Sequence, residues 1–177
     1  MLHGSDPDPT DDFCVRRPST TVTAPAPPTN KLPAFFPNLQ VTSAAVTREF
    51  WSSLGYGFDP TYSTDEVLCL ELIPDQVSVM LHEAGSFSRF LPGTTPSDSR
   101  TTTEVLLSFD LPGRDAVDAL YEKVLAAGGT RARETEDLGF MYTRSFRDLD
   151  GHVWEPFFMD VARAAEMFAQ DPTSTDA

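Results

Sequence analysis

Cysteine and long apolar stretches are both scarce in this sequence. The 177 residues include two cysteines, Cys14 and Cys69, whose wide spacing excludes a disulfide framework and a cysteine-based zinc site. No apolar run approaches the roughly 18 residues that a membrane-spanning helix needs. The first residues are acidic, where a secretory signal peptide would be basic and then apolar. We therefore expect a cytoplasmic protein.

Positive charge is also in short supply. Lysine and arginine together number 13 against 27 aspartates and glutamates, so the formal net charge is -14 at pH 7. Such a surface repels the phosphates of nucleic acids and the headgroups of anionic lipids. We therefore expect no nucleic acid and no membrane as a partner, and a small-molecule ligand or substrate instead.

The length of the chain suits one folded domain and is too short for two. Residues 1–32 are rich in proline, threonine and aspartate and offer little to bury, which predicts a disordered arm. Residues 33–160 carry the periodic apolar pattern of a folded domain. In the remaining segment, residues 161–177, we expect a short helix up to residue 169 and then a frayed tail.

Residues 34–82 predict a strand, a helix and three further strands. The helix should begin after Ser43, whose hydroxyl can cap it, and should end at Gly55. Its apolar stripe is expected to repeat every four residues from Val46 to Leu54. Three strand-like runs follow, at residues 56–58, 66–73 and 76–82.

The same order recurs over residues 103–159. A strand-like run and a helical stripe come first, and three strand-like runs follow at residues 130–134, 139–147 and 152–159. A shift of 68 residues, which sets Val41 on Phe109, aligns the predicted elements of the two halves. We therefore predict an α+β fold in which two βαβββ modules pair curved mixed sheets around a cavity. Apolar side chains of the connecting residues 83–102 are expected to cover its mouth.

Two segments of the sequence carry a family resemblance. NLQV followed by REFWSSLGYGF is similar to the first strand and helix end of the vicinal oxygen chelate superfamily. RSFRDLDGHVWEPFFMD resembles the closing hairpin of the same superfamily, which includes glyoxalase I, extradiol dioxygenases and bleomycin-resistance proteins. The resemblance covers roughly residues 35–160 and implies a glyoxalase-like fold, which in this superfamily is often a homodimer.

The resemblance also implies a site at four inward positions, one on the first and one on the last strand of each half. In this sequence they correspond to Phe36, Met80, Glu104 and Glu155, with His82 two residues beyond Met80 on the same strand face. His82, Glu104 and Glu155 are the candidate ligands of one divalent metal such as Mn, Fe, Mg, Ni or Zn. Glu104 and Glu155 are also the candidate catalytic residues. Phe36 cannot bind a metal, and His82 can equally be an ordinary residue of the rim.

Cross-strand pairing offers a second interpretation of Glu155. If the closing hairpin pairs Arg147 with His152, then Arg144 lies opposite Glu155, where opposite charges attract. A guanidinium there would compete with a metal for the carboxylate and would also offer an anchor for an anionic ligand. The residues expected to bind a ligand are Phe36, Asn38, Met80, Tyr142, Arg144 and Phe157.

Three classes of function remain open at this point. We favour a metal-free protein that binds a small metabolite or drug in a partly aromatic cavity, because Phe36 interrupts the implied ligand set. The first alternative is a metal-dependent lyase, isomerase or dioxygenase that uses Glu104 and Glu155. The second is an interaction protein without a working pocket. The fold does not decide between them.

Overall fold

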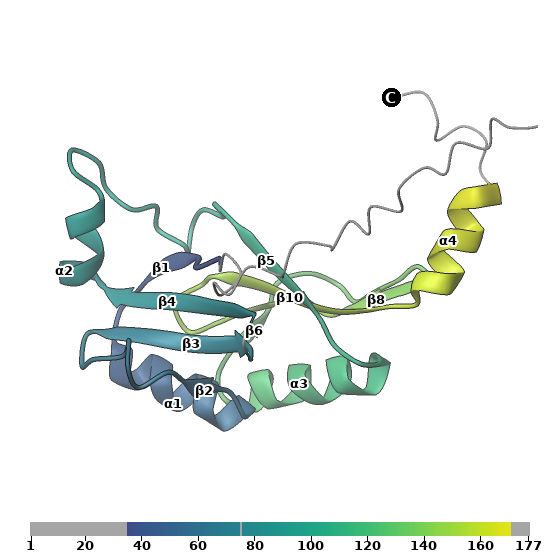
Figure 1. Cartoon of the computed structure of the whole chain (residues 1–177), viewed down its shortest axis with the longest axis horizontal. Coiled ribbons are helices and arrows are strands. Elements are labelled where there is room, and N and C mark those ends of the chain that lie inside the picture. The colour runs from purple at the N-terminus through teal and green to yellow at the C-terminus, as the bar shows by residue number, and fades with distance from the viewer. Residues whose placement is uncertain (1–34, 75, 171–177) are drawn as a thin grey trace, which may run out of the picture. The chain divides into compact units, whose positions relative to one another are not determined.

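A computed structural model describes residues 35–74 and 76–170 of the chain. These residues form two β-sheets with helices packed against them, in the α+β arrangement that the sequence predicts (Figure 1). The predicted arm over residues 1–32 and the predicted tail after residue 170 lie outside the described residues.

The first half is a four-stranded sheet with one helix. Its elements are β1 (Asn38–Val41), α1 (Ala44–Leu54), β2 (Gly57–Phe58), β3 (Val67–Ile73) and β4 (Val77–Glu83). The strand order is β1-β4-β3-β2, and β1 runs parallel to β4. The predicted order of one strand, a helix and three strands is therefore confirmed for this half.

Helix α1 begins and ends where local chemistry predicts. The Ser43 hydroxyl accepts a hydrogen bond from the Val46 backbone N–H at 3.4 Å, and Gly55 adopts the left-handed conformation with φ 103°. The predicted apolar stripe is partly wrong, because Val46 is 50% exposed whereas Thr47 is buried. The helix is thus rotated so that the face centred on Trp51 packs on the sheet.

The second half has the same order of a strand, a helix and further strands, but its sheet has six strands in place of four. Its elements are β5 (Leu106–Asp110), α3 (Arg114–Ala126), β6 (Thr130–Arg131), β7 (Glu136–Asp137), β8 (Met141–Thr143), β9 (Phe146–Arg147) and β10 (Val153–Met159). Strand β10 lies at the centre, parallel to β5 and antiparallel to both β8 and β9. One predicted strand over residues 139–147 is therefore divided into β8 and β9.

Pro156 explains this division. It lies in β10 opposite the break between β8 and β9, and a proline has no N–H to donate to a neighbouring strand. A single weak bond remains there, from the Arg144 N–H to the Pro156 carbonyl at 3.4 Å. The pairing register is the same on both sides of the break, since Thr143 lies opposite Phe157 and Phe146 opposite Trp154.

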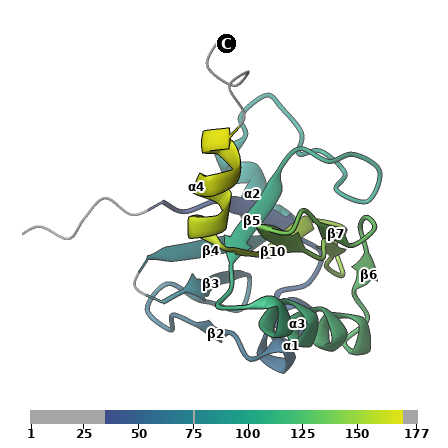
Figure 2. The ribbon, with the colours of Figure 1, turned by 90° about the vertical axis from the view of Figure 1, so that its right-hand side faces the viewer.

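The two halves share one hydrophobic core. Figures 1 and 2 show α1 and α3 next to each other on one side of the strands. Between them, the Trp51 ring lies with its centroid 4.6 Å from that of Trp154, in an edge-to-face arrangement, and both rings are fully buried. Because Trp51 belongs to the first half and Trp154 to the second, this pair joins the halves through the core.

The closing hairpin at residues 148–151 also joins the halves, through polar contacts. The Thr42 backbone N–H donates to the Asp150 carboxylate at 2.9 Å, and the Ser99 hydroxyl donates to the Asp150 carbonyl at 2.7 Å. Gly151 has φ 93°, and a Cβ at this position would lie 2.9 Å from the Ser99 carbonyl oxygen. The predicted turn is therefore confirmed, and it requires glycine for both conformation and space.

The remaining helices lie in the connecting segment and at the end of the described chain. Helix α2 (Ala84–Phe87) and the short helix η1 (Ser88–Phe90) follow β4, where the sequence predicts only an irregular connection. Helix α4 (Val161–Gln170) confirms the predicted terminal helix. None of the helices in the described part of the chain has both the length and the apolar character needed to cross a bilayer.

Candidate functional site

Each sheet turns one face toward α1 or α3, and the opposite face carries other residues; in the first half α2 packs near this opposite face. On β4, Leu81 belongs to the core beside α1, so the neighbouring His82 points to the opposite face. On β10, Trp154 belongs to the core, so Glu155 points to the opposite face. These outer faces carry the candidate site residues of each half.

The strand register identifies which residues lie beside His82 and Glu155. Gln40 of β1 lies opposite His82, and Ser108 of β5 lies opposite Glu155. Gln40 and Ser108 are 68 residues apart, so the predicted shift between the halves agrees with the register. Sequence reasoning instead placed Phe36 and Glu104 at these positions. The placement of Phe36 and Glu104 on these strands is wrong, because both residues precede their strands by two positions.

His82 is the centre of the first half, and it is buried, with 4% exposure, rather than on the rim. Its Nε2 lies 2.9 Å from the Asn38 Oδ1. The Asn38 Nδ2 donates to the Phe36 carbonyl at 2.8 Å, which leaves Oδ1 to face the ring. The His82 Nε2 therefore carries the proton and donates, while Nδ1 accepts from the Ser86 hydroxyl at 3.4 Å.

Aromatic rings complete the surroundings of His82. The Phe87 and Phe90 ring centroids lie 5.9 Å and 5.4 Å from the imidazole centroid. Burial lowers the pKa of His82 from its usual value, because the charged imidazolium would lose its hydration there. The first half thus has a neutral histidine at its centre, with both ring nitrogens already in hydrogen bonds.

Glu155 is the centre of the second half, and its carboxylate pairs with Arg133. The Ser108 hydroxyl donates to Glu155 Oε2 at 2.8 Å, and the Ser145 hydroxyl donates to Oε1 at 3.3 Å. Arg133 is held in turn by Ser145 at 2.9 Å and by the Glu136 carboxylate at 3.0 Å. The expectation that an arginine neutralises Glu155 is met by Arg133, which sequence reasoning did not single out.

Arg144 was the arginine predicted for that role, and the register corrects this prediction. Arg147 lies opposite Val153 rather than His152. A shift of one residue reverses the face on which every side chain of a strand lies, so Arg144 points toward α3.

The contacts of Arg144 and Tyr142 confirm this orientation. The Arg144 guanidinium donates to Asp118 and Glu122 at 3.0 Å each and lies 3.8 Å above the Tyr121 ring. Tyr142 donates its hydroxyl to the same Asp118 at 2.7 Å. Both residues therefore stabilise the packing of α3 on the sheet and lie away from the outer face.

The predicted metal ligands do not come together. Across residues 35–74 and 76–170, no three histidine, cysteine, aspartate or glutamate side chains are grouped closely enough to hold a metal ion. His82 uses both ring nitrogens within the first half, Glu155 is paired with a guanidinium, and Glu104 accepts a hydrogen bond from the Ser97 hydroxyl at 2.7 Å. The residues present therefore do not fit the divalent metal that the resemblance implies.

A cavity of about 630 Å³ lies between β1 and the segment that connects the halves, and we call it the seam cavity. Its apolar lining includes Leu39, Phe87, Leu91 and Val105. Its polar lining includes Asn38, Thr94, Thr95, Ser97 and Glu104. Of the apolar side chains expected to cover the cavity mouth, Phe87 and Leu91 line this cavity, whereas Phe90 does not. Sequence reasoning missed Ser97, because nothing local marks a serine of an irregular segment as part of a site.

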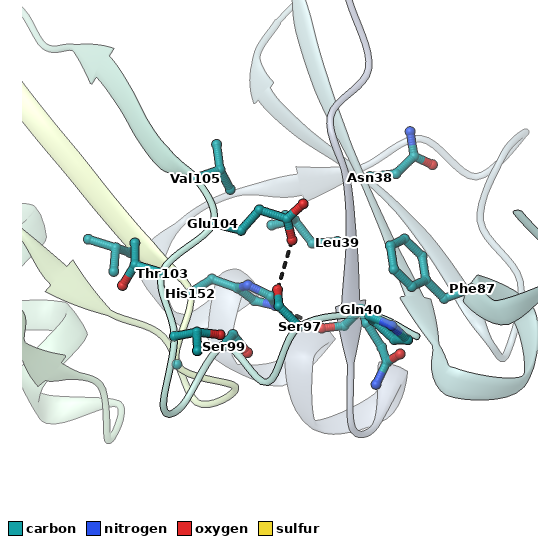
Figure 3. Close-up of a pocket in the computed structure, with 14 residues that line it drawn as sticks. Asn38, Leu39, Gln40, Phe87, Ser97, Ser99, Thr103, Glu104, Val105 and His152 are labelled. Carbon is teal, nitrogen blue, oxygen red and sulfur yellow. Dashed lines mark hydrogen bonds between the residues drawn. The ribbon is translucent and has the colours of Figure 1, made fainter. Parts of the chain in front are cut away.

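A narrower pocket adjoins the seam cavity and shares much of its lining (Figure 3). Figure 3 shows the Glu104 carboxylate directed toward Ser97, with His152 below it. The His152 ring donates from Nε2 to the Gln40 backbone carbonyl at 2.7 Å. His152 therefore links the closing hairpin to β1 at the base of this pocket.

A second cavity, of about 500 Å³, lies on the outer face of the second half, and we call it the arginine cavity. It is lined by Thr103, Leu106, Ala132, Arg133, Ser145, Arg147, Val153 and Glu155. Glu104 and Glu155 thus line different cavities, so the prediction that they share one pocket is wrong. Of the other residues predicted to bind a ligand, Asn38 lines the seam cavity, whereas Phe36, Met80 and Phe157 line neither cavity.

Solved structures with similar folds are known. A hypothetical protein from S. aureus is 26% identical with a TM-score of 0.60, over 71% of this chain and 92% of that one. A glyoxalase-related enzyme from Fulvimarina pelagi is 18% identical with a TM-score of 0.60, over 73% and 90% of the two chains. A glyoxalase/bleomycin resistance protein/dioxygenase family enzyme from Burkholderia phytofirmans is 16% identical with a TM-score of 0.58, over 70% and 96%.

These similarities are at the level of structure, since no protein-family model and no curated protein matches the sequence. They agree with the duplicated module, the paired sheets and the closing hairpin described above. The predicted resemblance is therefore confirmed for the fold: this chain has a glyoxalase-like fold.

Proposed function

We propose that this protein binds a small organic molecule in the seam cavity without the help of a metal ion. The observation that carries the proposal is the cavity itself. Its volume of about 630 Å³ lies within the usual range for small-molecule sites, and its lining combines apolar walls with a few polar groups. Phe87 and Leu91 offer the apolar surface, and Asn38 and Glu104 offer hydrogen-bonding groups.

The charge of the cavity favours a ligand with a basic group. Glu104 is the one charged side chain among the described residues that line the seam cavity. The Ser97 hydroxyl binds one carboxylate oxygen of Glu104, which orients the group and leaves the other oxygen available. The net charge of -14 also attracts cations toward the surface. An amine attached to an apolar or aromatic body fits these features.

The metal-dependent alternative lacks a ligand set among the residues that the structure describes. An enzyme of that kind needs donors with lone pairs free to bind the ion, but His82 and Glu155 are committed to Asn38 and Arg133. Several similar structures carry names that combine glyoxalase, bleomycin resistance and dioxygenase. Of the activities in those names, non-catalytic binding of a small molecule is the one that this site supports.

Calorimetric titration with two matched probes tests the proposal. We expect 2-phenylethylamine to bind the full chain, and 2-phenylethanol, which has the same ring without the charge, to bind about tenfold more weakly. The Glu104→Gln substitution should abolish this difference, because it removes the charge and keeps the size of the side chain. Glu134→Gln, at an exposed glutamate outside both cavities, is the control. Equal binding of the two probes to the unaltered chain, or no binding of either, would contradict the proposal.

We further propose that the protein forms a homodimer. Apolar side chains gather at the end of the second half, where Val161, Met167 and Phe168 of α4 are 72%, 46% and 60% exposed and Leu138 is 45% exposed. A second copy of the chain would cover this surface. Light scattering should give the mass of two chains at micromolar concentration, and Phe168→Glu should reduce it to that of one. The mass of one chain for the unaltered protein would refute the dimer.

A further inference from the structure

We propose that the arginine cavity is a second ligand site, specific for a small molecule that carries a carboxylate. This cavity shares no lining residue with the seam cavity and takes a ligand of opposite charge. Two guanidinium groups, of Arg133 and Arg147, line it together with one carboxylate, that of Glu155. Arg133 pairs with both Glu155 and Glu136, whereas Arg147 forms no ion pair within the described residues. Arg147 therefore supplies positive charge to the cavity of a protein whose net charge is -14, and it attracts an anionic ligand.

Arg147 is the residue that receives the carboxylate. Its Nη1 donates to the Gly151 carbonyl at 2.9 Å, which fixes the side chain. Within residues 35–74 and 76–170, the guanidinium of Arg147 makes no other hydrogen bond and no ion pair. Its remaining N–H groups are thus left to donate to a ligand, and the planar guanidinium matches the geometry of a carboxylate.

Arg133 and Glu155 form the rigid wall of the cavity. Arg133 is held from three sides by Ser145, Glu136 and Glu155. Its guanidinium cancels the charge of Glu155, so this carboxylate does not repel an anion bound next to it. Because these contacts exist before a ligand arrives, binding costs little ordering of the wall. The pair occupies the position at which the resemblance implies a metal ion, and it substitutes a fixed guanidinium for the cation.

The apolar side chains that line the arginine cavity indicate what kind of group can accompany the carboxylate of the ligand. Leu106, Ala132 and Val153 line the same cavity, and Leu106 is 48% exposed at its edge. An exposed leucine beside charged groups is a surface on which a small ring or short alkyl chain can pack. The cavity of about 500 Å³ has room for such a group next to the carboxylate. Aromatic and short aliphatic monocarboxylates are therefore the class of ligand that fits.

Titration of the full chain with benzoate and with benzamide, its uncharged analogue, tests this site. We expect benzoate to bind at least about tenfold more tightly than benzamide. Arg147→Met should remove that preference, and Arg147→Lys should keep part of it. Arg131→Met is the matched control, because Arg131 lies on the neighbouring strand, pairs with Glu134 and does not line the cavity. Its binding of benzoate should stay within about twofold of the unaltered chain.

Equal binding of benzoate and benzamide would overturn the proposal, as would an equal loss of benzoate binding in Arg131→Met and Arg147→Met. If Arg147→Met does not fold, Leu106→Trp replaces it, since a larger side chain at the cavity edge should block benzoate while leaving every charge in place. Glu104→Gln should leave benzoate binding unchanged. Failure of the seam cavity to bind 2-phenylethylamine is therefore distinguishable from failure of this site.

Discussion

The two halves of the molecule share a backbone plan but differ at their centres. At equivalent places on the last strand of each sheet, the first half has His82 and the second has Glu155. His82 is neutral, buried and held by an amide and a hydroxyl, whereas the Glu155 carboxylate is held by the guanidinium of Arg133. The two halves therefore share the same strand register. The polar residue at the centre of each half, His82 or Glu155, has different hydrogen-bonding partners.

The two proposed ligand cavities also differ in the charged side chains that line them. The seam cavity has Glu104 and no basic lining residue within the described chain, so it favours a cation. In the arginine cavity, Arg147 has no carboxylate partner among the described residues, so this cavity favours an anion. A metal ion shared between the halves would have required His82 and Glu155 to direct unoccupied lone pairs at the same point.

The largest expected effect comes from breaking the hairpin that joins the halves. Gly151→Ala should lower the free energy of unfolding by about 2 to 4 kcal/mol, because alanine disfavours the left-handed conformation and its Cβ would meet the Ser99 carbonyl oxygen. Gly85→Ala is the control, since a Cβ there meets no atom within 4 Å. Chemical denaturation measures both variants. Equal stability of the two would show that the hairpin does not hold the halves together.

A smaller effect is expected from breaking the ion pair of the second half. Arg133→Met should destabilise the protein by about 1 to 3 kcal/mol, because it leaves the mostly buried Glu155 carboxylate with hydroxyl donors alone. Adding Glu155→Gln should recover part of this loss, since the unpaired charge is then absent. The double-mutant cycle by urea denaturation measures the coupling. Strict additivity of the two changes would mean that the pair contributes nothing.

The smallest expected effect concerns the neutral centre of the first half. Because burial lowers the pKa of His82, the unfolded chain takes up this proton at a higher pH than the folded chain. The stability from neutral His82 is therefore fully present above the usual histidine pKa of about 6.5 and is lost as the pH falls toward the lowered value.

Denaturation curves between pH 7.5 and 4.5, a range of about three units around the usual histidine pKa, test this expectation. His82→Gln should be less stable at neutral pH and should lose less stability on acidification than the unaltered chain. An identical pH dependence for His82→Gln would contradict a neutral buried His82.

Local signals in the sequence predicted most of the fold. The Ser43 cap, the Gly55 end and the Asp148–Gly151 turn depend on neighbouring residues, so their chemistry is visible in the sequence. The division of the strand at Arg144 was missed because it depends on Pro156, which lies on a different strand. Helix α2 was missed because four residues give too short an apolar period to detect.

The candidate site was harder to predict than the fold, because its residues meet only through the register. An error of one residue in the closing hairpin placed Arg144 and Tyr142 on the outer face. Arg133 was missed because it lies in an irregular segment, 22 residues before Glu155 in the chain. The resemblance pointed to Glu155, and strand alternation from Met80 pointed to His82; their roles in a site stay predictions. Their hydrogen-bonding partners, Asn38 and Arg133, lie far from them in the sequence, so only the structure shows them.

Chemical-shift mapping with both charged probes tests the central claim most directly. The isotope-labelled full chain would be titrated with 2-phenylethylamine and, separately, with benzoate. The account predicts that the amine shifts the signals of Asn38, Ser97 and Glu104, while benzoate shifts those of Leu106 and Arg147. If both probes shift the same residues, or if the amine shifts none that line the seam cavity, the assignment of a cation-binding seam between the two halves is wrong.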